Sequence, residues 1–201
     1  MIDYLKNRYD RLTGRVDESD IYNLPNAITL LRICVIPVLF LLLLSPGKIW
    51  SLVIALIFIA ANLTDLLDGY IARRYHIETT MGKFLDPIAD KLVVNTAMIL
   101  LIPLNRIPAW IVALTIIRDV AVDGMRSVAS SKGVVIDASS LGKRKTLCQI
   151  FAVSALIIHY PFFGINAYLV GMVILYLALI LTVHSGIDYF HKFYREVIKK
   201  T

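Results

Sequence analysis

Six long apolar runs occupy most of this 201-residue chain and limit its fold more than any other feature. A membrane-spanning helix needs roughly 17 to 25 mostly apolar residues, and each run is close to that length. With 58% hydrophobic residues and a mean hydropathy of +0.71, the chain is too apolar for an ordinary soluble domain. We therefore predict an all-α integral membrane protein with six transmembrane helices, the last two separated by a tight turn at 161–164. The runs cover residues 27–44, 49–67, 84–103, 110–128, 147–163 and 165–183.

The basic residues between the runs and at their ends predict how the helices are oriented. If the N-terminus is cytoplasmic, sixteen Lys and Arg residues lie on the cytoplasmic side and only Lys48 and Arg106 lie on the other. Such an excess of bases marks the cytoplasmic side of a membrane protein. We therefore expect a multi-pass protein of the cytoplasmic (inner) membrane with both termini in the cytoplasm. The net charge of +6 then reflects this rule and anionic membrane lipid, not nucleic acid, because the bases are spread over four segments.

The residues before the first run are polar and predict a separate N-terminal segment, 1–22. Its apolar residues have helical spacing with charges between them, which favours an amphipathic helix at the membrane interface. A frayed polar tail is the alternative. We expect a six-span domain at 23–190 and a basic cytoplasmic tail at 191–201. The apolar residues of the N-terminal segment are Ile2, Leu5, Tyr9 and Leu12.

Four Asp residues stand between the second and third runs in the pattern D-x2-D-G-x2-A-R-x8-G-x3-D-x3-D, which extends from Asp65 to Asp90. Charged side chains at membrane depth are costly, so they need cations, hydrogen bonds or a wet cavity. On helices, Asp65 and Asp68 are spaced i, i+3, and Asp86 and Asp90 are spaced i, i+4, so each pair shares one face. Two such helices would bring four carboxylates to one site at the cytoplasmic boundary.

The residues around these acids indicate what the site binds. Carboxylate oxygens suit hard divalent cations such as Mg²⁺ or Mn²⁺, and two such ions balance the charge of four carboxylates. Arg73 adds a fork of donors suited to phosphate oxygens. Gly69, Ala72 and Gly82 lie close to the acids along the helix and leave room for a bulky ligand. The pattern therefore predicts a two-metal phosphoryl-transfer site.

At these residues the chain resembles the CDP-alcohol phosphatidyltransferase family, because every fixed position of that family's motif is matched. The resemblance implies a six-helix membrane enzyme, usually a homodimer, that displaces CMP from a CDP-linked lipid with an alcohol and uses divalent metal. It also implies a role for each motif residue. Asp65, Asp68 and Asp86 would bind metal, Asp90 would bind metal and act as general base, and Gly69, Ala72, Arg73 and Gly82 would bind the CDP diphosphate, with Thr64 and Thr79 facing the nucleotide.

Further stretches resemble the phosphatidylglycerophosphate synthases within that family. This closer resemblance implies CDP-diacylglycerol as the donor and glycerol 3-phosphate as the acceptor. One departure is Asp119, where that group has Glu, and another is the length of the polar N-terminal segment. The similar stretches, which together extend over about residues 22–190, are 23–32, 82–91, 117–119, 124–126 and 142–146 with Gln149.

An acceptor that carries its own phosphate needs cations besides Arg73. Arg118 lies within the fourth run, where an unpaired charge would be costly, so we predict that it belongs to an anion pocket. An ion pair with Asp119 or Asp123 is the alternative for Arg118, and an anchor at the membrane boundary is the alternative for the lysines. The predicted pocket consists of Arg118, Lys143, Lys145 and Arg126.

Three polar residues at the start of the first run are candidates for contact with the nucleotide or a lipid headgroup. They are equally consistent with residues that cap and anchor the first helix, since a Thr hydroxyl can bond back to its own helix. These residues are Asn26, Thr29 and Arg32.

The predicted reaction is a direct displacement in which Asp90 takes the proton of the acceptor hydroxyl, with phosphatidylglycerol phosphate and CMP as products. Within the family, serine, inositol phosphate and phosphatidylglycerol are alternative acceptors. In other classes, buried acids within six spans also occur in cation transporters, and a decayed site would leave a membrane scaffold without activity. Arg73 among the acids disfavours the transporter, and the intact motif disfavours the scaffold.

Overall fold

The computed structural model of the protein describes residues 24–44, 47–75, 80–134, 136, 140–162 and 164–198, with the backbone alone at 24–30, 65–75, 80–87, 90, 140, 143, 162 and 198. The N-terminal segment at 1–22 lies outside these residues, so its amphipathic helix stays a prediction.

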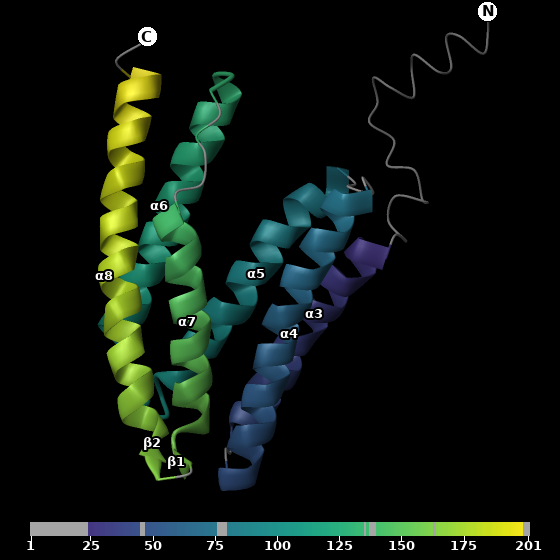
Figure 1. Ribbon diagram of the computed structural model, residues 1–201, viewed down its shortest axis with the longest axis vertical. Coiled ribbons are helices and arrows are strands. Elements are labelled where there is room, and N and C mark those ends of the chain that lie inside the picture. Colours follow the sequence, from purple (N-terminus) through teal and green to yellow (C-terminus); the bar gives the residue numbers. More distant parts are fainter. Residues whose placement is uncertain are drawn as a thin grey trace, which may run out of the picture.

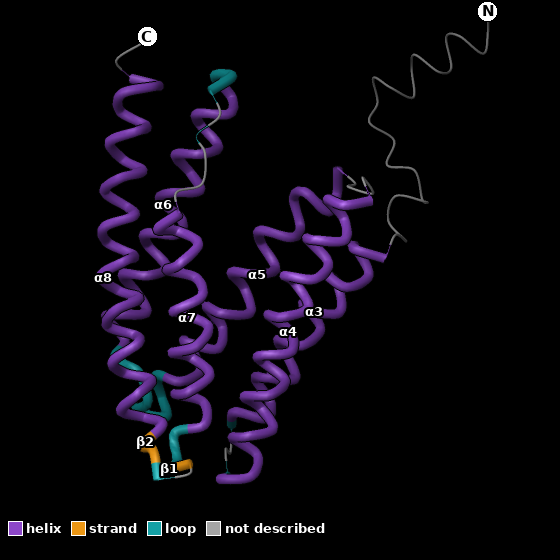
Figure 2. Tube along the Cα trace, viewed as in Figure 1, coloured by secondary structure: helices purple, strands orange, loops and turns teal. Residues whose placement is uncertain are grey.

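The described chain is almost entirely helical, as Figure 2 shows. Each of six long helices overlaps one of the predicted apolar runs, which confirms the all-α prediction. A helix satisfies its backbone hydrogen bonds within its own segment, as an apolar environment requires. The helices are α3 (Leu24–Leu43), α4 (Lys48–Tyr75), α5 (Thr80–Leu101), α6 (Ala109–Ser131), α7 (Ser140–Ile158) and α8 (Ala167–Phe193); strands β1 (Pro161–Phe162) and β2 (Ile165–Asn166) join α7 to α8, and a π-helical turn, η1 (Tyr194–Ile198), follows α8.

Two helices continue beyond their apolar runs. The run that ends at 67 lies in a helix that continues to Tyr75, and the run that ends at 183 lies in one that continues to Phe193. Neither extension contains proline, so nothing in the sequence stops the helix where the apolar residues stop. As a result, the first half of the four-Asp motif is wholly helical, and α8 extends into the predicted basic tail.

Helix α7, in contrast, ends at Ile158 and not at 163. His159 has a φ of 60°, the left-handed conformation that commonly terminates a helix, and its N–H donates to the carbonyl of Ala155 at 3.0 Å. Pro161 has no N–H with which to continue the helix. The antiparallel pairing of β1 with β2 confirms the tight turn predicted at 161–164.

The helices form two groups that are joined most tightly at the end carrying the hairpin. Figure 1 shows α6, α7 and α8 on one side and α3 and α4 on the other, with α5 crossing between them. The main core at the hairpin end takes fully buried side chains from all six long helices, among them Leu39, Phe58, Met98, Ile111, Leu156 and Leu175. A second, smaller cluster near the opposite end draws on α6, α8, η1 and Ile136.

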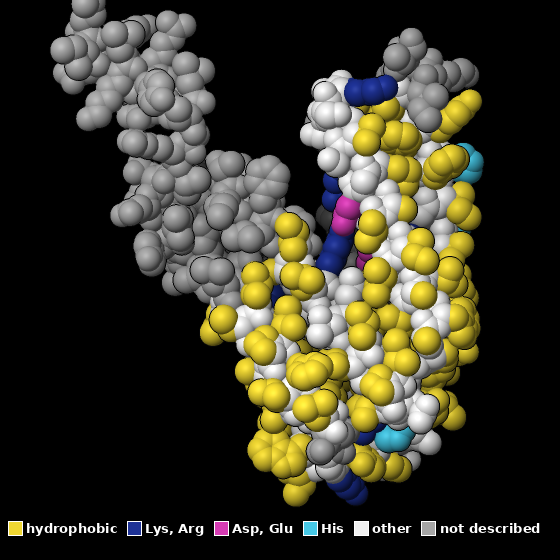
Figure 3. Space-filling view, turned by 180° about the vertical axis from the view of Figure 1, so that it is seen from behind, with side chains coloured by type: hydrophobic (Ala, Val, Ile, Leu, Met, Phe, Trp, Pro, Cys, Tyr) yellow, Lys and Arg dark blue, Asp and Glu magenta, His cyan; other side chains and the backbone are white. Residues whose placement is uncertain are grey.

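The outward faces of the six helices remain apolar. Large hydrophobic side chains such as Leu41, Ile117 and Ile180 are 64–66% exposed, and Figure 3 shows such side chains over much of one face. Lipid is a solvent that would cover an apolar surface of this extent. Within the described residues, one helix, Ala167–Val197, is long and apolar enough to cross a membrane; Leu31–Leu43, Lys48–Thr64 and Lys91–Leu101 are shorter apolar stretches. The number of spans and their orientation stay predictions.

A buried arginine contacts the end of α7 at the hairpin end of the molecule. Arg106, 4% exposed, donates from Nη1 to the carbonyl of Ile157 at 2.6 Å and lies 5.9 Å from the ring centre of Tyr160. A cation there is favourable because the last carbonyls of α7 lack partners within the helix. One of the two bases predicted for the non-cytoplasmic side therefore has a structural role.

Helices α7 and α8 approach each other closely at Gly171. A Cβ added there would lie 2.9 Å from Cγ of Leu156 and 3.1 Å from its backbone nitrogen. Real Cβ atoms are almost never so close to their neighbours, and the nearby backbone of α7 cannot rotate away as a flexible side chain can. The missing side chain of Gly171 therefore sets the spacing of this helix pair.

We predict that Gly171→Ala lowers the free energy of unfolding by about 1 to 3 kcal/mol, because overpacking pushes α7 and α8 apart. The matched control is Gly124→Ala on α6, where an added Cβ meets nothing within 4 Å. That change should stabilise the helix by about 0.5 to 1 kcal/mol, since Ala is the better helix former. Thermal unfolding of both variants in detergent measures the difference, and equal effects at the two positions would contradict the close contact.

Candidate active site

The four-Asp motif lies on two consecutive helices. Asp65 and Asp68 are in α4, and Asp86 and Asp90 are in α5, so the helical spacing predicted for each pair is confirmed. Figure 1 shows that the end of α4 and the start of α5 lie at the same end of the molecule, away from the hairpin. The side chains of these acids, and those of Gly69 to Arg73 and Gly82, lie outside the described part, as does Thr79 altogether. Convergence of the carboxylates therefore stays a prediction.

A small cavity lies directly beside the start of the motif. It has a volume of about 40 Å³, and side chains of α3 and α4 line it. Arg32, which is only 3% exposed, lines this cavity. Thr64, the residue that precedes Asp65, lines it as well. The structure thus brings together two residues that the sequence proposed separately for nucleotide or headgroup contact. The side chains of Asn26 and Thr29 are outside the description.

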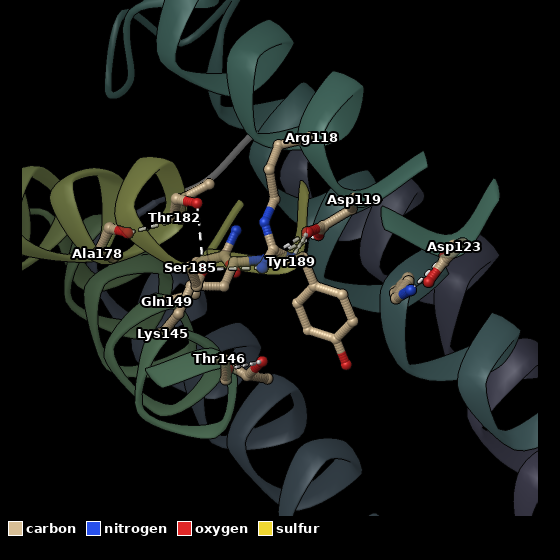
Figure 4. Close-up of polar contacts among 12 residues, drawn as sticks. Arg118, Asp119, Asp123, Lys145, Thr146, Gln149, Ala178, Thr182, Ser185 and Tyr189 are labelled. Carbon is tan, nitrogen blue, oxygen red and sulfur yellow. Dashed lines mark hydrogen bonds and ion pairs between the residues drawn. The ribbon is translucent and has the colours of Figure 1, made fainter. Parts of the chain in front are cut away.

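A buried cluster of charges joins α6, α7 and α8. The carboxylate of Asp119 accepts from Nζ of Lys145 with both oxygens, at 2.7 and 2.8 Å, and from Nη1 of Arg118 at 2.9 Å. The other terminal nitrogen of Arg118, Nη2, donates to Oγ of Ser185 at 2.7 Å. Figure 4 shows these four side chains pointing toward one another from the three helices. We refer to Arg118, Asp119, Lys145 and Ser185 as the Asp119 cluster.

Burial makes this cluster unusual. The side chains of Lys145 and Asp119 are 4% and 8% exposed, and that of Arg118 is 16% exposed. Ionised groups removed from water need opposite charges and hydrogen bonds to persist. Two cations share one carboxylate, so the cluster carries one positive charge in excess and is suited to an anion.

A second ion pair connects this region to the helix that carries Asp90. Lys91, the next residue in α5, donates to the carboxylate of Asp123, which lies one turn after Asp119 on α6. Both partners of the pair are more exposed than those of the Asp119 cluster, at 36% and 45%. The pair therefore links α6, one turn beyond Asp119, to the middle of α5, at the residue that follows Asp90.

The four predicted acceptor-phosphate residues are not all brought together. Arg118 and Lys145 meet at Asp119, whereas Nη2 of Arg126 donates to the hydroxyl of Tyr189 at 2.6 Å, further along α6 and α8. The side chain of Lys143 is outside the description. The ion pair of Arg118 with Asp119, which the sequence left open as an alternative, is observed, and it is part of a cluster that also holds Lys145.

Two polar residues near this site were not singled out as functional by the sequence. Ser185 is fully buried in α8, and Gln149 is buried one turn after Lys145 and donates to Sδ of Met98 at 3.7 Å. The available signal was their polarity within or next to an apolar run, because a polar group buried in a helix bundle needs a partner. That signal alone does not identify the partner.

The chain belongs to the CDP-alcohol phosphatidyltransferase family, whose model matches residues 22–184. Its similar relatives include a Bacillus subtilis (strain 168) protein, 43% identical over 85% of this chain and 95% of its own length, named CDP-diacylglycerol–glycerol-3-phosphate 3-phosphatidyltransferase. A Rickettsia typhi protein of the same name is 41% identical over 84% of this chain and 95% of its own. A Mycobacterium tuberculosis (strain H37Rv) protein named probable phosphatidylglycerophosphate synthase is 36% identical over 92% and 88% of the two chains.

The donor set of the motif fits divalent metal. It consists of four carboxylates on two adjacent helices, which is the oxygen-rich chemistry that Mg²⁺ and Mn²⁺ prefer. Among the side chains that the structure describes, no three His, Cys, Asp or Glu residues form a metal-binding group. The motif acids do not belong to that described set, so they remain the candidates.

The two carboxylates of α6 should differ in their effect on stability. Asp119→Ala would leave the buried Lys145 without its carboxylate and should cost about 3 to 5 kcal/mol of unfolding free energy. Asp123→Ala removes a pair that is more than a third exposed and should cost no more than about 1 kcal/mol. Unfolding of both variants in detergent gives the comparison, and a similar cost at the two positions would contradict the buried character of the Asp119 cluster.

Proposed function

We propose that this protein transfers the phosphatidyl group of CDP-diacylglycerol to glycerol 3-phosphate and releases CMP. The names of three similar relatives support this reaction, and the chain and each relative cover most of each other's length. The structural observation that carries the choice of acceptor is the pair of buried cations, Arg118 and Lys145, held on one carboxylate. A phosphate-free alcohol would give these cations nothing to bind.

The acids of the motif hold the metal in this proposal. Asp65 and Asp68 from α4 and Asp86 and Asp90 from α5 would bind Mg²⁺ or Mn²⁺, two ions in each site. Bound there, the ions supply positive charge that neutralises the diphosphate and favours departure of CMP. Arg73 holds the diphosphate oxygens through its fork of donors. Gly69, Ala72 and Gly82 leave space for the CDP group, and Thr64 and Thr79 face the nucleotide.

The chain's own residues then supply the displacement. Asp90 accepts the proton of the acceptor hydroxyl, and the acceptor oxygen forms a bond to the phosphorus of the phosphatidyl group. The bond from that phosphorus to the bridging oxygen of CMP breaks, so one P–O bond replaces another and no covalent enzyme intermediate is needed. Residues that fix the acceptor close to the phosphorus lower the barrier by orientation.

The acceptor's phosphate binds to the Asp119 cluster. Arg118 and Lys145 provide charge-assisted donors, and Lys143 and Arg126 are further cations of the same helices. The Lys91–Asp123 pair supports this placement, because it ties α6 to α5 at the residue that follows Asp90. Donor and acceptor would then meet between the motif helices and the cluster.

The membrane setting completes the proposal. Six spans, cytoplasmic termini and a site at the cytoplasmic face would let a water-soluble acceptor reach a lipid donor. The distribution of bases and the exposed apolar surface of the helices support it. The active form is proposed to be a homodimer in the cytoplasmic membrane, with residues 1–22 lying on the surface of the bilayer and Asn26, Thr29 and Arg32 near the headgroups.

The reaction is tested with the detergent-solubilised protein, CDP-diacylglycerol and a panel of alcohols, by following CMP release. We expect release with glycerol 3-phosphate in Mg²⁺ or Mn²⁺, and none after treatment with EDTA until metal is restored. Serine, inositol phosphate and phosphatidylglycerol are the control acceptors. Release with one of these in place of glycerol 3-phosphate would replace the proposed acceptor, and ion flux without CMP release would indicate a transporter.

Asp90→Asn tests the general base. It should reduce kcat by roughly 10² to 10⁴ while CDP-diacylglycerol binding is largely preserved, because the amide cannot take the hydroxyl proton. Asp123→Asn, a carboxylate on the neighbouring helix outside the motif, is the matched control and should keep most of the activity. If binding fell as far as turnover in Asp90→Asn, the residue would be a metal ligand only.

A further inference from the structure

Side chains from two helices fix the orientation of the Arg118 guanidinium. Asp119, on its own helix, binds one terminal nitrogen and Ser185, from α8, binds the other. Because Gly186 has no side chain, the side chain of Arg118 can pass close beside it. A Cβ at Gly186 would lie 3.3 Å from Cγ of Arg118. With two anchors on opposite sides, the planar group has one orientation.

Ser185 can serve as this anchor because its own proton is already used. Its Oγ donates to the carbonyl of Thr182 at 3.1 Å, so the lone pairs of the oxygen are left to accept from Arg118. Ser185 is fully buried, and the exchange of this bond for one with water is therefore blocked. The hydroxyl has a fixed direction as well as a fixed position.

Asp119 holds the second cation beside the first. Nη1 of Arg118 and Nζ of Lys145 lie within 2.9 Å of the same oxygen, Oδ1. Two cations this close repel each other, and among the side chains that the structure describes the shared carboxylate of Asp119 offsets the repulsion. Nε of Arg118 is buried and has no hydrogen-bond partner among the described residues, so the guanidinium still has an unused donor.

We propose that Asp119 and Ser185 are positioning residues that hold Arg118 and Lys145 as a preformed receptor for the phosphate of the acceptor. The inference rests on the proposed function. Neither residue touches the substrate: each acts through the cations, whose spacing and direction it sets. A receptor that is already assembled spares the cost of ordering two long side chains when the phosphate binds.

The decisive experiment compares Ser185→Ala with Ser154→Ala. Ser154 is also buried in a helix and also donates to a carbonyl of its own helix, that of Ile150, but it lies outside the Asp119 cluster. In detergent-solubilised enzyme, Ser185→Ala should raise KM for glycerol 3-phosphate about 3- to 10-fold. Its kcat should stay within about twofold, and its KM for CDP-diacylglycerol should not change. Ser154→Ala should match the unsubstituted protein in all three quantities.

Substitutions at Asp119 test whether its negative charge is needed to hold Arg118 and Lys145. Asp119→Asn should raise KM for glycerol 3-phosphate more than about tenfold, and Asp119→Glu, which keeps the carboxylate, should restore it to within about threefold. If Asp119→Asn does not fold, the two serine variants still decide the question. The proposal is overturned if Ser185→Ala behaves like Ser154→Ala, or if it affects kcat or the KM of CDP-diacylglycerol as much as that of the acceptor.

Failure of the inference differs from failure of the proposed function. If the unsubstituted protein releases CMP with glycerol 3-phosphate and the variants leave its KM unchanged, only the positioning roles are wrong. If the unsubstituted protein is active with another alcohol and inactive with glycerol 3-phosphate, the acceptor and the inference fail together.

Discussion

The carboxylate of Asp119 binds the charged groups of two other residues, and this largely buried contact helps to fix the arrangement of three helices. Lys145 on α7 and Arg118 on α6 both donate to this group, and Ser185 on α8 holds the far side of the guanidinium. An ionised side chain in an apolar interior is tolerated only when it is paired. The pairing therefore constrains how α6, α7 and α8 are rotated toward one another, and it leaves an excess positive charge suited to a phosphate.

The two ends of the molecule are built differently. At the hairpin end, side chains from six helices are packed in one core, and Arg106 donates to a carbonyl at the end of α7. The contact of Gly171 with Leu156 draws α7 and α8 together near that end. The motif on α4 and α5 and the Asp119 cluster lie toward the opposite half, where the smaller cluster involves α6 and α8. The hairpin end is thus held by apolar packing, whereas the opposite half combines a smaller apolar cluster with paired polar side chains.

Membership of the CDP-alcohol phosphatidyltransferase family and the geometry of the cluster address different parts of the reaction. In the proposed reaction the motif would bind the donor, because its acids and Arg73 suit metal and a diphosphate. The Asp119 cluster would bind the acceptor, because its cations lie on other helices than the motif. The ion pair between Lys91 and Asp123 is the described contact that relates the two, through the residue next to Asp90.

Local sequence determined the helices, the spacing of the four Asp residues within them and the turn before α8, because apolar period, residue spacing and proline act over a few residues. It also offered the pairing of Arg118 with Asp119, which are adjacent in the chain. It misplaced the end of α7, where the backbone turns left-handed at His159 while apolar residues continue. Only the tertiary structure decided that Lys145, 26 residues away, shares Asp119, that Ser185 anchors Arg118 from α8, and that Gly171 meets Leu156. These contacts depend on how the packed helices are rotated and how far apart they lie. Sequences with the same apolar pattern can pack with different rotations and separations. Spacing along the chain therefore cannot specify these contacts.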